Sequence, residues 1–426
     1  MSGEGWKIIS LEEAIEFRNG KSSPDRKDTG LNPVFGGNGI IGYTEQSNSD
    51  FETIILGRVG AYCGNVYYYK GKCWVTDNAI IGKIKSSYDG LFLFYLLKMI
   101  DLNNHRSGSS QPLINQSILN SIQAKVPPQT TQQRIAVILS ALDDKIELNL
   151  QTNATLEAMA QAIFKEWFVD FRFPGATGEM QDSELGPIPK GWQAGRLDDI
   201  CELNPKLSLK KGTLTKYVEM KNLSQSSLAV EEPREREFTS GSKFQNGDTL
   251  LARITPCLEN GKTGFVDFLN GKEIGWGSTE FIVLRGRNHI NPYYVYCLSR
   301  FPDFREFAIQ SMVGSSGRQR VVESILSDYP IVIPSKENIA LYHQVVEKLF
   351  FQVKNNSDQS ATLAQIRDAL LPKLMNGEIV VGVGSRHALD RNPVTVLGLE
   401  PKNRAGLEPA PTQSTITKKQ RGRHGR

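Results

Sequence analysis

The sequence has few cysteines and no apolar stretch long enough to cross a membrane. Its five cysteines are scattered over 426 residues without a C-x-x-C pair, which excludes a disulfide framework and predicts reduced thiols. The longest apolar run, 91–100, contains Lys98 and is far shorter than the roughly 20 residues that span a bilayer. The N-terminal stretch MSGEGWKIIS has no apolar signal core. We therefore expect a cytoplasmic protein without a membrane partner.

Motifs for metal and phosphate binding are also missing. The five histidines are dispersed and none belongs to an H-E-x-x-H motif, and the chain has no G-x-x-x-x-G-K-[ST] loop. The run 37–42 fits G-x-G-x-x-G, and 35–39 fits the F-x-G-x-G pattern of S-adenosylmethionine loops in DNA methyltransferases. A cofactor loop follows a buried strand and opens a helix, whereas polar residues flank this one. A Gly-rich turn is the better interpretation.

Two further motifs are better explained by structure than by catalysis. Asn291-Pro292-Tyr293-Tyr294 is close to the Asn/Asp-Pro-Pro-Tyr motif of amino-methyltransferases, but its third residue is Tyr, so we interpret it as a helix start. Asp143-Asp144-Lys145 could form a nuclease-like carboxylate–lysine set, but it lies within a predicted helix, on a solvated face. The sequence therefore predicts a non-catalytic chain with no metal and no cofactor of its own.

The net charge of +4 is unevenly distributed. Residues 381–426 contain 9 basic and 3 acidic residues, which leaves −2 for residues 1–380. This C-terminal stretch is rich in Gly, Pro, Ser and Thr without an apolar period, so we expect a disordered basic tail. Any contact with nucleic acid must then come from local basic patches of the body.

Two long helices dominate the pattern. Between 130 and 171 apolar residues recur in steps of three, four or seven with no Pro or Gly, which predicts one helix of roughly 55–60 Å. The stretch 337–374 repeats this stripe 207 positions later, so we expect the two helices to pair as a coiled coil. The predicted seam residues are Ile138, Leu142, Ile146, Asn149, Leu156, Ile163, Val345, Leu349, Val353, Asn356, Leu363 and Leu370. The matched asparagines would fix the register of the pair.

The rest of the chain is duplicated as well. Gly-Trp opens both halves, at Gly5 and Gly191. Each half continues with a strand-like segment that ends in arginine, an apolar helix candidate, and a small polar loop. The sequence thus predicts an α+β protein in which two pseudo-symmetric mixed α/β domains are separated by an antiparallel pair of long coiled-coil helices. The expected segments are domain 1–128, helix 129–171, linker 172–189, domain 190–334, helix 335–377 and tail 378–426.

Basic and amide side chains in the loops are the candidates for binding double-stranded DNA. Arg can read guanine and Gln adenine in the major groove, while Lys and Ser suit phosphates. The candidates are Lys21, Arg58, Arg106, Ser109, Gln111, Lys206, Lys243, Arg253, Lys262, Arg318, Gln319 and Arg320. For Arg58 and Arg253 a structural role is the alternative, because they recur at the same place in the two halves.

Several motifs together resemble the specificity subunit of Type I restriction–modification systems. They are Pro127-Pro128 with Gln132-Gln133-Arg134-Ile135 and Ile138-Leu139, Leu142 to Ile146, Ala162 to Phe171, Gly186 to Trp192, Gly277-Ser278-Thr279-Glu280-Phe281, and Arg367 to Ile379. The first half departs from the fifth of these, with Thr76-Asp77-Asn78-Ala79 in its place. The resemblance covers about residues 5–380 and does not include the tail.

This resemblance implies two target-recognition domains that each read one half of a bipartite DNA site. It also implies that the coiled coil sets the unread gap and docks two methyltransferase subunits, with two restriction/translocase subunits joining that core. S-adenosylmethionine, ATP and Mg²⁺ would then belong to those partners, and the assembled complex would be an adenine-N6 DNA methyltransferase and ATP-dependent endonuclease. The alternatives are a fused adenine methyltransferase or nuclease, and an assembly scaffold that does not read DNA.

Overall fold

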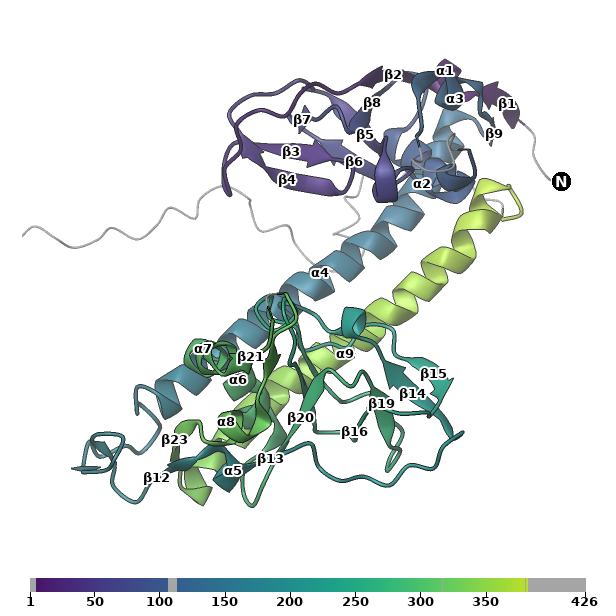
Figure 1. Ribbon diagram of the computed structural model, residues 1–426. Coiled ribbons are helices and arrows are strands. Elements are labelled where there is room, and N and C mark those ends of the chain that lie inside the picture. Colours follow the sequence, from purple (N-terminus) through teal and green to yellow (C-terminus); the bar gives the residue numbers. More distant parts are fainter. Residues whose placement is uncertain (1–4, 106–112, 316, 380, 382–426) are drawn as a thin grey trace, which may run out of the picture. The chain divides into compact units, whose positions relative to one another are not determined.

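The computed structural model describes residues 5–105, 113–315, 317–379 and 381, which divide between two compact units (Figure 1). The first unit contains residues up to 141 and from 373 onwards, and the second contains residues 142–372. Each long helix therefore runs through parts of both units. Most of the predicted basic tail, 380 and 382–426, lies outside the described residues.

The first unit is built on a four-stranded antiparallel sheet with the order β2-β8-β5-β6 and a smaller sheet with the order β4-β3-β7. In the smaller sheet β3 pairs parallel with β7, and a separate pair joins β1 to β9. The elements are β1 (Lys7–Ser10), α1 (Leu11–Ala14), β2 (Ile15–Asn19), β3 (Asn32–Gly36), β4 (Gly39–Thr44), β5 (Glu52–Gly57), β6 (Val66–Lys70), β7 (Trp74–Val75), β8 (Ala79–Ile84), α2 (Gly90–Ile100), α3 (Gln116–Ser121) and β9 (Gln123–Val126).

The second unit repeats this plan with different loops. Its main sheet has the order β13-β20-β17-β18, its smaller sheet the order β15-β14-β19-β16 with β14 parallel to β19, and β12 pairs with β23. The elements are β10 (Met180–Gln181), β11 (Ile188–Pro189), β12 (Gln193–Arg196), α5 (Leu197–Ile200), β13 (Cys201–Leu203), β14 (Leu214–Val218), β15 (Arg234–Glu237), β16 (Ser242–Phe244), β17 (Thr249–Ala252), β18 (Thr263–Phe265), β19 (Gly275–Gly277), β20 (Phe281–Gly286), α6 (Pro292–Arg300), α7 (Pro302–Gln310), β21 (Met312–Val313), β22 (Arg320–Val321), α8 (Glu323–Ser327) and β23 (Pro330–Ile333). The predicted duplication and the α+β class are confirmed.

Local chemistry explains where the shorter helices begin. The side chains of Asp89 and Asn291 cap α2 and α6 by accepting the backbone N–H groups of Phe92 and Tyr294. Pro292 occupies the first turn of α6, where its missing N–H costs nothing. The motif at 291–294 is therefore a helix start, as predicted. The glycine-rich run 37–42 is a turn and strand, because Gly37 and Asn38 join β3 to β4 and no helix follows.

The two long helices, α4 (Gln129–Phe168) and α9 (Lys336–Met375), each contain 40 residues. The first ends three residues earlier than predicted, because Phe171 adopts a positive φ of 57° and the N–H of Asp170 bonds back to the carbonyl of Lys165 at 2.9 Å. Gly377, with φ of 75°, follows the end of the second. The expected linker 172–189 is partly ordered, since β10 pairs with β11 and Phe173 stacks on Trp192 with ring centroids 4.9 Å apart.

Within the second unit the helices run antiparallel and meet through a polar layer. The Nδ2 atom of Asn149 donates to Gln359 Oε1 at 2.9 Å and lies 3.2 Å from the carbonyl oxygen of Asn356. Asn356 Nδ2 in turn donates to Asn153 Oδ1 at 2.9 Å. Asn149 and Asn356 occupy matching positions of the two helices, 207 residues apart, and they contact each other across the helix pair. A buried polar layer of this kind has one satisfied register.

Elsewhere in the second unit, α4 and α9 share a hydrophobic core with the domain. Aromatic side chains of α4 and α9 pack on those of the domain, with ring centroids 4.9 Å apart between Phe168 and Tyr294 and also between Phe168 and Tyr342. Phe164 and Trp192 belong to the same cluster of buried residues. The helices and the second sheet are therefore parts of one hydrophobic core.

The seam prediction needs correction at two positions. Ile138 and Val345 are 37% and 38% exposed, so they lie outside the buried stripe. In α9 the stripe passes instead through the neighbouring Val346 and through Phe350, both at most 2% exposed. In the second unit α9 packs on the domain as well as on α4, so its buried face is wider than a coiled-coil seam and includes Val346 and Phe350. Of the other predicted positions, Asn149, Val353 and Asn356 are buried, and the partly buried ones are Leu142, Ile146, Leu156, Ile163, Leu349, Leu363 and Leu370.

The polar layer gives a stability prediction. Replacing Asn149→Ala removes the side chain that donates to Gln359 and to the carbonyl of the buried Asn356, which costs about 1–3 kcal/mol of unfolding free energy. Gln151→Ala, an exposed position on the same helix, is the matched control and changes stability little. Urea unfolding of the two purified variants measures the difference, and equal midpoints would contradict the role assigned to the layer.

Candidate nucleic-acid interface

Three of the predicted DNA-contact residues line one pocket of the second unit. Lys206, Lys243 and Arg253 surround a hollow of about 430 Å³ together with Ser242 and Thr279. The pocket includes part of the Gly277–Phe281 motif. The motif's glycine is required by packing, because a Cβ at Gly277 would lie 2.6 Å from the carbonyl oxygen of Val218. Strand pairing thus places this motif beside the basic side chains.

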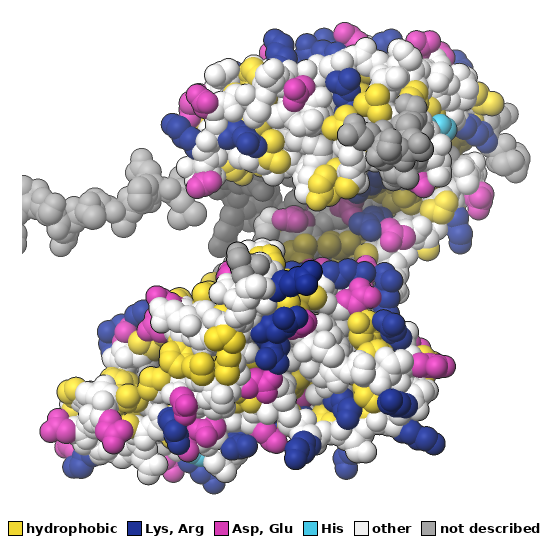
Figure 2. Space-filling view, in the orientation of Figure 1, with side chains coloured by type: hydrophobic (Ala, Val, Ile, Leu, Met, Phe, Trp, Pro, Cys, Tyr) yellow, Lys and Arg dark blue, Asp and Glu magenta, His cyan; other side chains and the backbone are white. Residues whose placement is uncertain are grey.

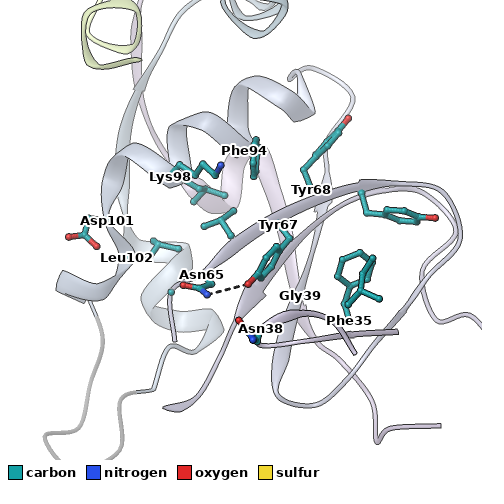
Figure 3. A pocket seen from close by; sticks show the side chains of 15 residues that line it. Phe35, Asn38, Gly39, Asn65, Tyr67, Tyr68, Phe94, Lys98, Asp101 and Leu102 are labelled. Carbon is teal, nitrogen blue, oxygen red and sulfur yellow. Dashed lines mark hydrogen bonds between the residues drawn. The ribbon is translucent and has the colours of Figure 1, made fainter. Parts of the chain in front are cut away.

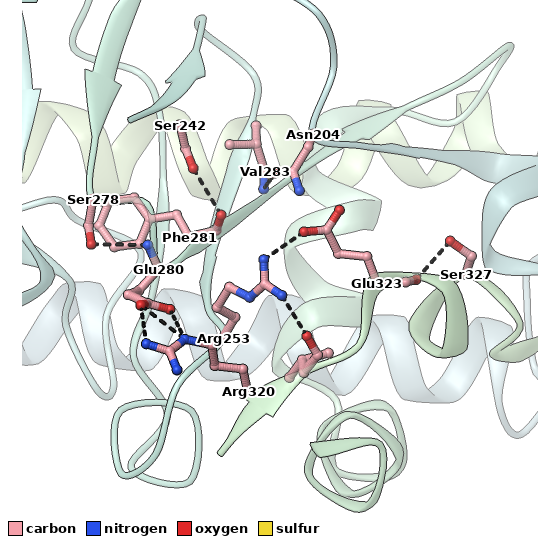
Figure 4. Close-up of polar contacts among 11 residues, drawn as sticks. Asn204, Ser242, Arg253, Ser278, Glu280, Phe281, Val283, Arg320, Glu323 and Ser327 are labelled. Carbon is pink, nitrogen blue, oxygen red and sulfur yellow. Dashed lines mark hydrogen bonds and ion pairs between the residues drawn. The ribbon is translucent and has the colours of Figure 1, made fainter. Parts of the chain in front are cut away.

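Arg253 is held by the protein itself. Its Nη1 atom pairs with Glu323 at 2.7 Å and its Nη2 atom donates to the carbonyl of Val321 at 3.0 Å (Figure 4). The side chain is 24% exposed. With two of its donor groups occupied by the start of α8 and by β22, Arg253 fastens these segments to the main sheet.

The recurrence of Arg58 and Arg253 has a structural cause. The backbone N–H of Arg58 bonds to the carbonyl of Asn78 at 2.9 Å, and that of Arg253 bonds to Glu280 at 3.0 Å. Their carbonyls likewise accept N–H groups, from Ile114 at 3.0 Å and from Val321 at 2.9 Å. Each arginine therefore stands at the same backbone junction of its unit, which supports the structural alternative for both. The Arg58 side chain reaches the carbonyl of Asp77 at 3.5 Å.

Arg320 forms a fork with Glu280. Its Nη2 and Nε atoms lie 2.7 Å and 2.9 Å from the carboxylate oxygens of Glu280 (Figure 4). These hydrogen bonds raise the pKa of the Arg320 guanidinium above its ordinary value. This fork holds β22 against the Gly277–Phe281 motif, and it leaves N–H groups of the guanidinium outside the ion pair. The DNA contact of Arg320 stays a prediction.

The lysines of the second unit fall into two groups. Lys243 donates to the carbonyl of Leu207 at 2.9 Å, and Lys262 donates to that of Met220 at 2.8 Å. Lys206 and Arg318, by contrast, are exposed, and Gln319 is half-buried. Figure 2 shows Lys and Arg side chains spread over this unit and interleaved with acidic ones. Lys206 and Arg318 are therefore the best placed of the predicted residues for contact with a phosphate.

The first unit has a pocket that sequence reasoning missed. It encloses about 860 Å³ between the β3–β4 turn, β6 and α2, and its wall includes Tyr67, Phe94 and Lys98 (Figure 3). Asn65 Nδ2 donates to the hydroxyl of Tyr67 at 3.2 Å. The run Tyr67-Tyr68-Tyr69 was the available signal, because three successive tyrosines on one strand place aromatic side chains on both of its faces.

The remaining predictions for this unit are tested only in part. Lys21 is exposed, and its backbone N–H bonds to Val75 at 3.1 Å, which places it at the edge of the smaller sheet. The predicted residues Arg106, Ser109 and Gln111 lie outside the described residues.

The chain matches a family model described as the Type I restriction modification DNA specificity domain, over residues 3–158 and 189–365. The chain belongs to this family. The two matched regions coincide with the two copies of the fold, so the duplication is a family feature of this chain.

Curated relatives agree with the family assignment. The chain is 25% identical over 420 residues to the Type I restriction enzyme MjaIX specificity subunit of Methanocaldococcus jannaschii, covering 88% of this chain and 94% of that relative. It is 25% identical over 359 residues to the HindI specificity subunit of Haemophilus influenzae, covering 68% and 77%. The crystal structure of a Type-I restriction-modification system S subunit from M. genitalium shares the fold, with a TM-score of 0.55 at 16% identity over 87% of this chain and 96% of that one.

The described part of this family member shows two further features. Among residues 5–105, 113–315, 317–379 and 381, no group of three or more His, Cys, Asp or Glu side chains is arranged to hold a metal ion. None of the helices in the same ranges combines the length and apolar character needed to span a membrane.

The arginine contacts predict a difference in stability between two positions. Arg253→Ala removes the donors of Glu323 and Val321, so we expect a loss of about 1–3 kcal/mol of unfolding free energy. Arg318→Ala changes an exposed side chain and should stay within about 0.5 kcal/mol of the wild type. Urea unfolding of the purified chain compares them, and an Arg253→Ala variant as stable as Arg318→Ala would show that the contacts are not structural.

Proposed function

We infer that this chain is the DNA-specificity subunit of a Type I restriction–modification complex. Each unit is a recognition unit that reads one half of a bipartite DNA site, and the pair α4 and α9 sets the gap between the halves. The observation that carries this proposal is the repeat itself, in which one fold occurs twice and each copy leads into a 40-residue helix. A single reader would need neither the second copy nor the matched helices.

The target is asymmetric. The two recognition units share strand order but differ in their loops, most clearly between the paired strands of the smaller sheet. In the first unit the turn at Gly37 and Asn38 joins β3 to β4, whereas residues 219–233 join β14 to β15 in the second. Since base contacts come from loops on a common scaffold, the two half-sites have different sequences.

The chemistry belongs to partner subunits. We infer that the helix pair docks two methyltransferase subunits, that two restriction/translocase subunits join them, and that S-adenosylmethionine, ATP and Mg²⁺ bind to these partners. The assembled complex then methylates adenine at N6 and cleaves DNA with ATP, while this chain has no active site. Methyl transfer by the purified chain alone would favour a fused methyltransferase instead, and a complex that binds DNA without sequence preference would favour a scaffold.

Phosphate contacts give the first prediction. The double variant Lys206→Ala with Arg318→Ala removes two exposed positive charges, so the assembled complex should bind DNA more weakly and with a shallower salt dependence. The slope of log K against log salt should fall by about 0.9 for each phosphate that is no longer neutralised. Lys348→Ala, exposed on α9, is the matched control. An unchanged salt slope in a fluorescence titration would exclude both residues from the interface.

The role of the helices as a spacer gives the second prediction. Adding one turn to both α4 and α9, about 5.4 Å, should widen the unread gap by one or two base pairs, since base pairs are about 3.4 Å apart. A control variant receives the same insertion between Gly175 and Gly178, in the segment that joins α4 to β10. Methylation mapping reads the gap in both variants, and an unchanged gap after lengthening the helices would refute the spacer.

A further inference from the structure

One carboxylate of the long helix α4 is buried inside the second recognition unit. Glu157 is 7% exposed. Its Oε2 atom accepts the backbone N–H of Leu228 at 2.8 Å and the hydroxyl of Tyr296 at 2.8 Å, and its Oε1 atom accepts Ser227 Oγ at 3.2 Å. A buried carboxylate is costly unless it is hydrogen-bonded in this way. Glu157 therefore joins the helix to two separate parts of the domain, the 224–228 loop and α6.

Arg300 extends this connection into the sheet. Its Nε atom donates to the hydroxyl of Tyr296 at 3.2 Å, so one chain of polar contacts runs from Arg300 through Tyr296 to Glu157. The guanidinium also donates to the carbonyls of Gln225 at 2.7 Å and Thr263 at 3.0 Å. The loop, the start of strand β18 and helix α6 are thus fastened together before they meet α4.

The protonation states fit this arrangement. Burial raises the pKa of Tyr296 well above its ordinary value, so its hydroxyl remains a donor at neutral pH. Burial also raises the pKa of the Glu157 carboxyl, while the hydrogen bonds from Leu228 and Tyr296 oppose that shift. Both shifts follow mainly from burial, because the domain encloses the Tyr296 hydroxyl as well as the Glu157 carboxyl.

In the first recognition unit other residues occupy the positions that match Tyr296 and Arg300. Counted from the N-caps Asp89 and Asn291, Phe94 stands where α6 has Tyr296, and Lys98 stands where it has Arg300. Phenylalanine has no hydroxyl to donate. The tight β3–β4 turn takes the place of the long 219–233 connection, and the corresponding space between this turn, β6 and α2 is the 860 Å³ pocket (Figure 3).

Glu157 adds directed contacts to an apolar interface. The core shared by α4, α9 and the domain includes Ala160, Phe164 and Phe168 of α4, and Leu156 packs against it. Apolar packing has no preferred direction, whereas a hydrogen bond weakens steeply when its angle changes. The three hydrogen bonds of Glu157 therefore favour one orientation of the 224–228 loop and α6 on the helix.

We propose that Glu157 is a positioning residue that fixes the angle of the second recognition unit on α4 and so keeps its half-site at one distance from the other. This role rests on the proposed function. A side chain that contacts no DNA then determines how strictly the second unit selects sites with one gap length. The aromatic core supplies most of the stability of the contact between α4 and the domain, and Glu157 fixes the orientation of the domain on the helix.

Methylation mapping of the complete complex tests the proposal, with Glu157→Ala as the main variant. We expect Glu157→Ala to keep the same half-site sequences but to lose roughly tenfold, about 1.4 kcal/mol, in discrimination against sites whose gap differs by one base pair. Tyr296→Phe, which keeps the ring and removes one donor, should shift discrimination in the same direction by less. Glu147→Ala, an exposed glutamate on the same helix, should behave as the wild type.

The outcomes separate the proposal from the function on which it rests. Wild-type gap selectivity in a folded Glu157→Ala or Tyr296→Phe variant overturns the positioning role and leaves the proposed function intact. Should Glu157→Ala fail to fold, Tyr296→Phe decides the question, because its ring is retained. A wild-type complex without any bipartite methylation site would overturn the proposed function, and the positioning role with it.

Discussion

The structure of the second unit depends on a hydrophobic core that the domain and both long helices build together. Phe164 and Phe168 of α4, and Tyr342 of α9, pack directly on Tyr294 of α6. None of these surfaces is complete alone, because an isolated helix pair would expose the aromatic stripe and the isolated domain would expose α6. The reader and its spacer are held together by one set of aromatic contacts, so recognition and spacing become properties of one folded body.

Much of this architecture could be predicted from the sequence, because it rests on periodicity and repetition. The long apolar stripes predicted α4 and α9, and the offset of 207 residues predicted their pairing around Asn149 and Asn356. Helix starts were predictable for the same reason, since Asn291 followed by Pro292 is a local signal that needs no tertiary context. The glycine-rich run 37–42 could be assigned to a turn because its flanks were polar.

The details of the site could not be predicted, because they depend on which residues meet. Arginine is a common residue at DNA interfaces, which made Arg253 and Arg320 candidates. In the structure they pair with Glu323 and Glu280, which are 70 and 40 residues away along the chain. The stripe of α9 passes through Val346 and not Val345, since the packed domain selects the buried face of the helix. Glu157 was equally hidden, because a glutamate on a long helix is usually solvated and only the 224–228 loop reveals its role.

Native-state hydrogen exchange in increasing denaturant tests the central claim most directly. If the second unit and its helices share one core, the amides of Phe164 and Tyr342 on the helices and of Leu251 and Ile282 in the sheet must open together. They should show the same free energy of exchange and the same dependence on denaturant. Helix amides that exchange at a distinctly lower free energy than the sheet amides, with a smaller dependence on denaturant, would contradict the account.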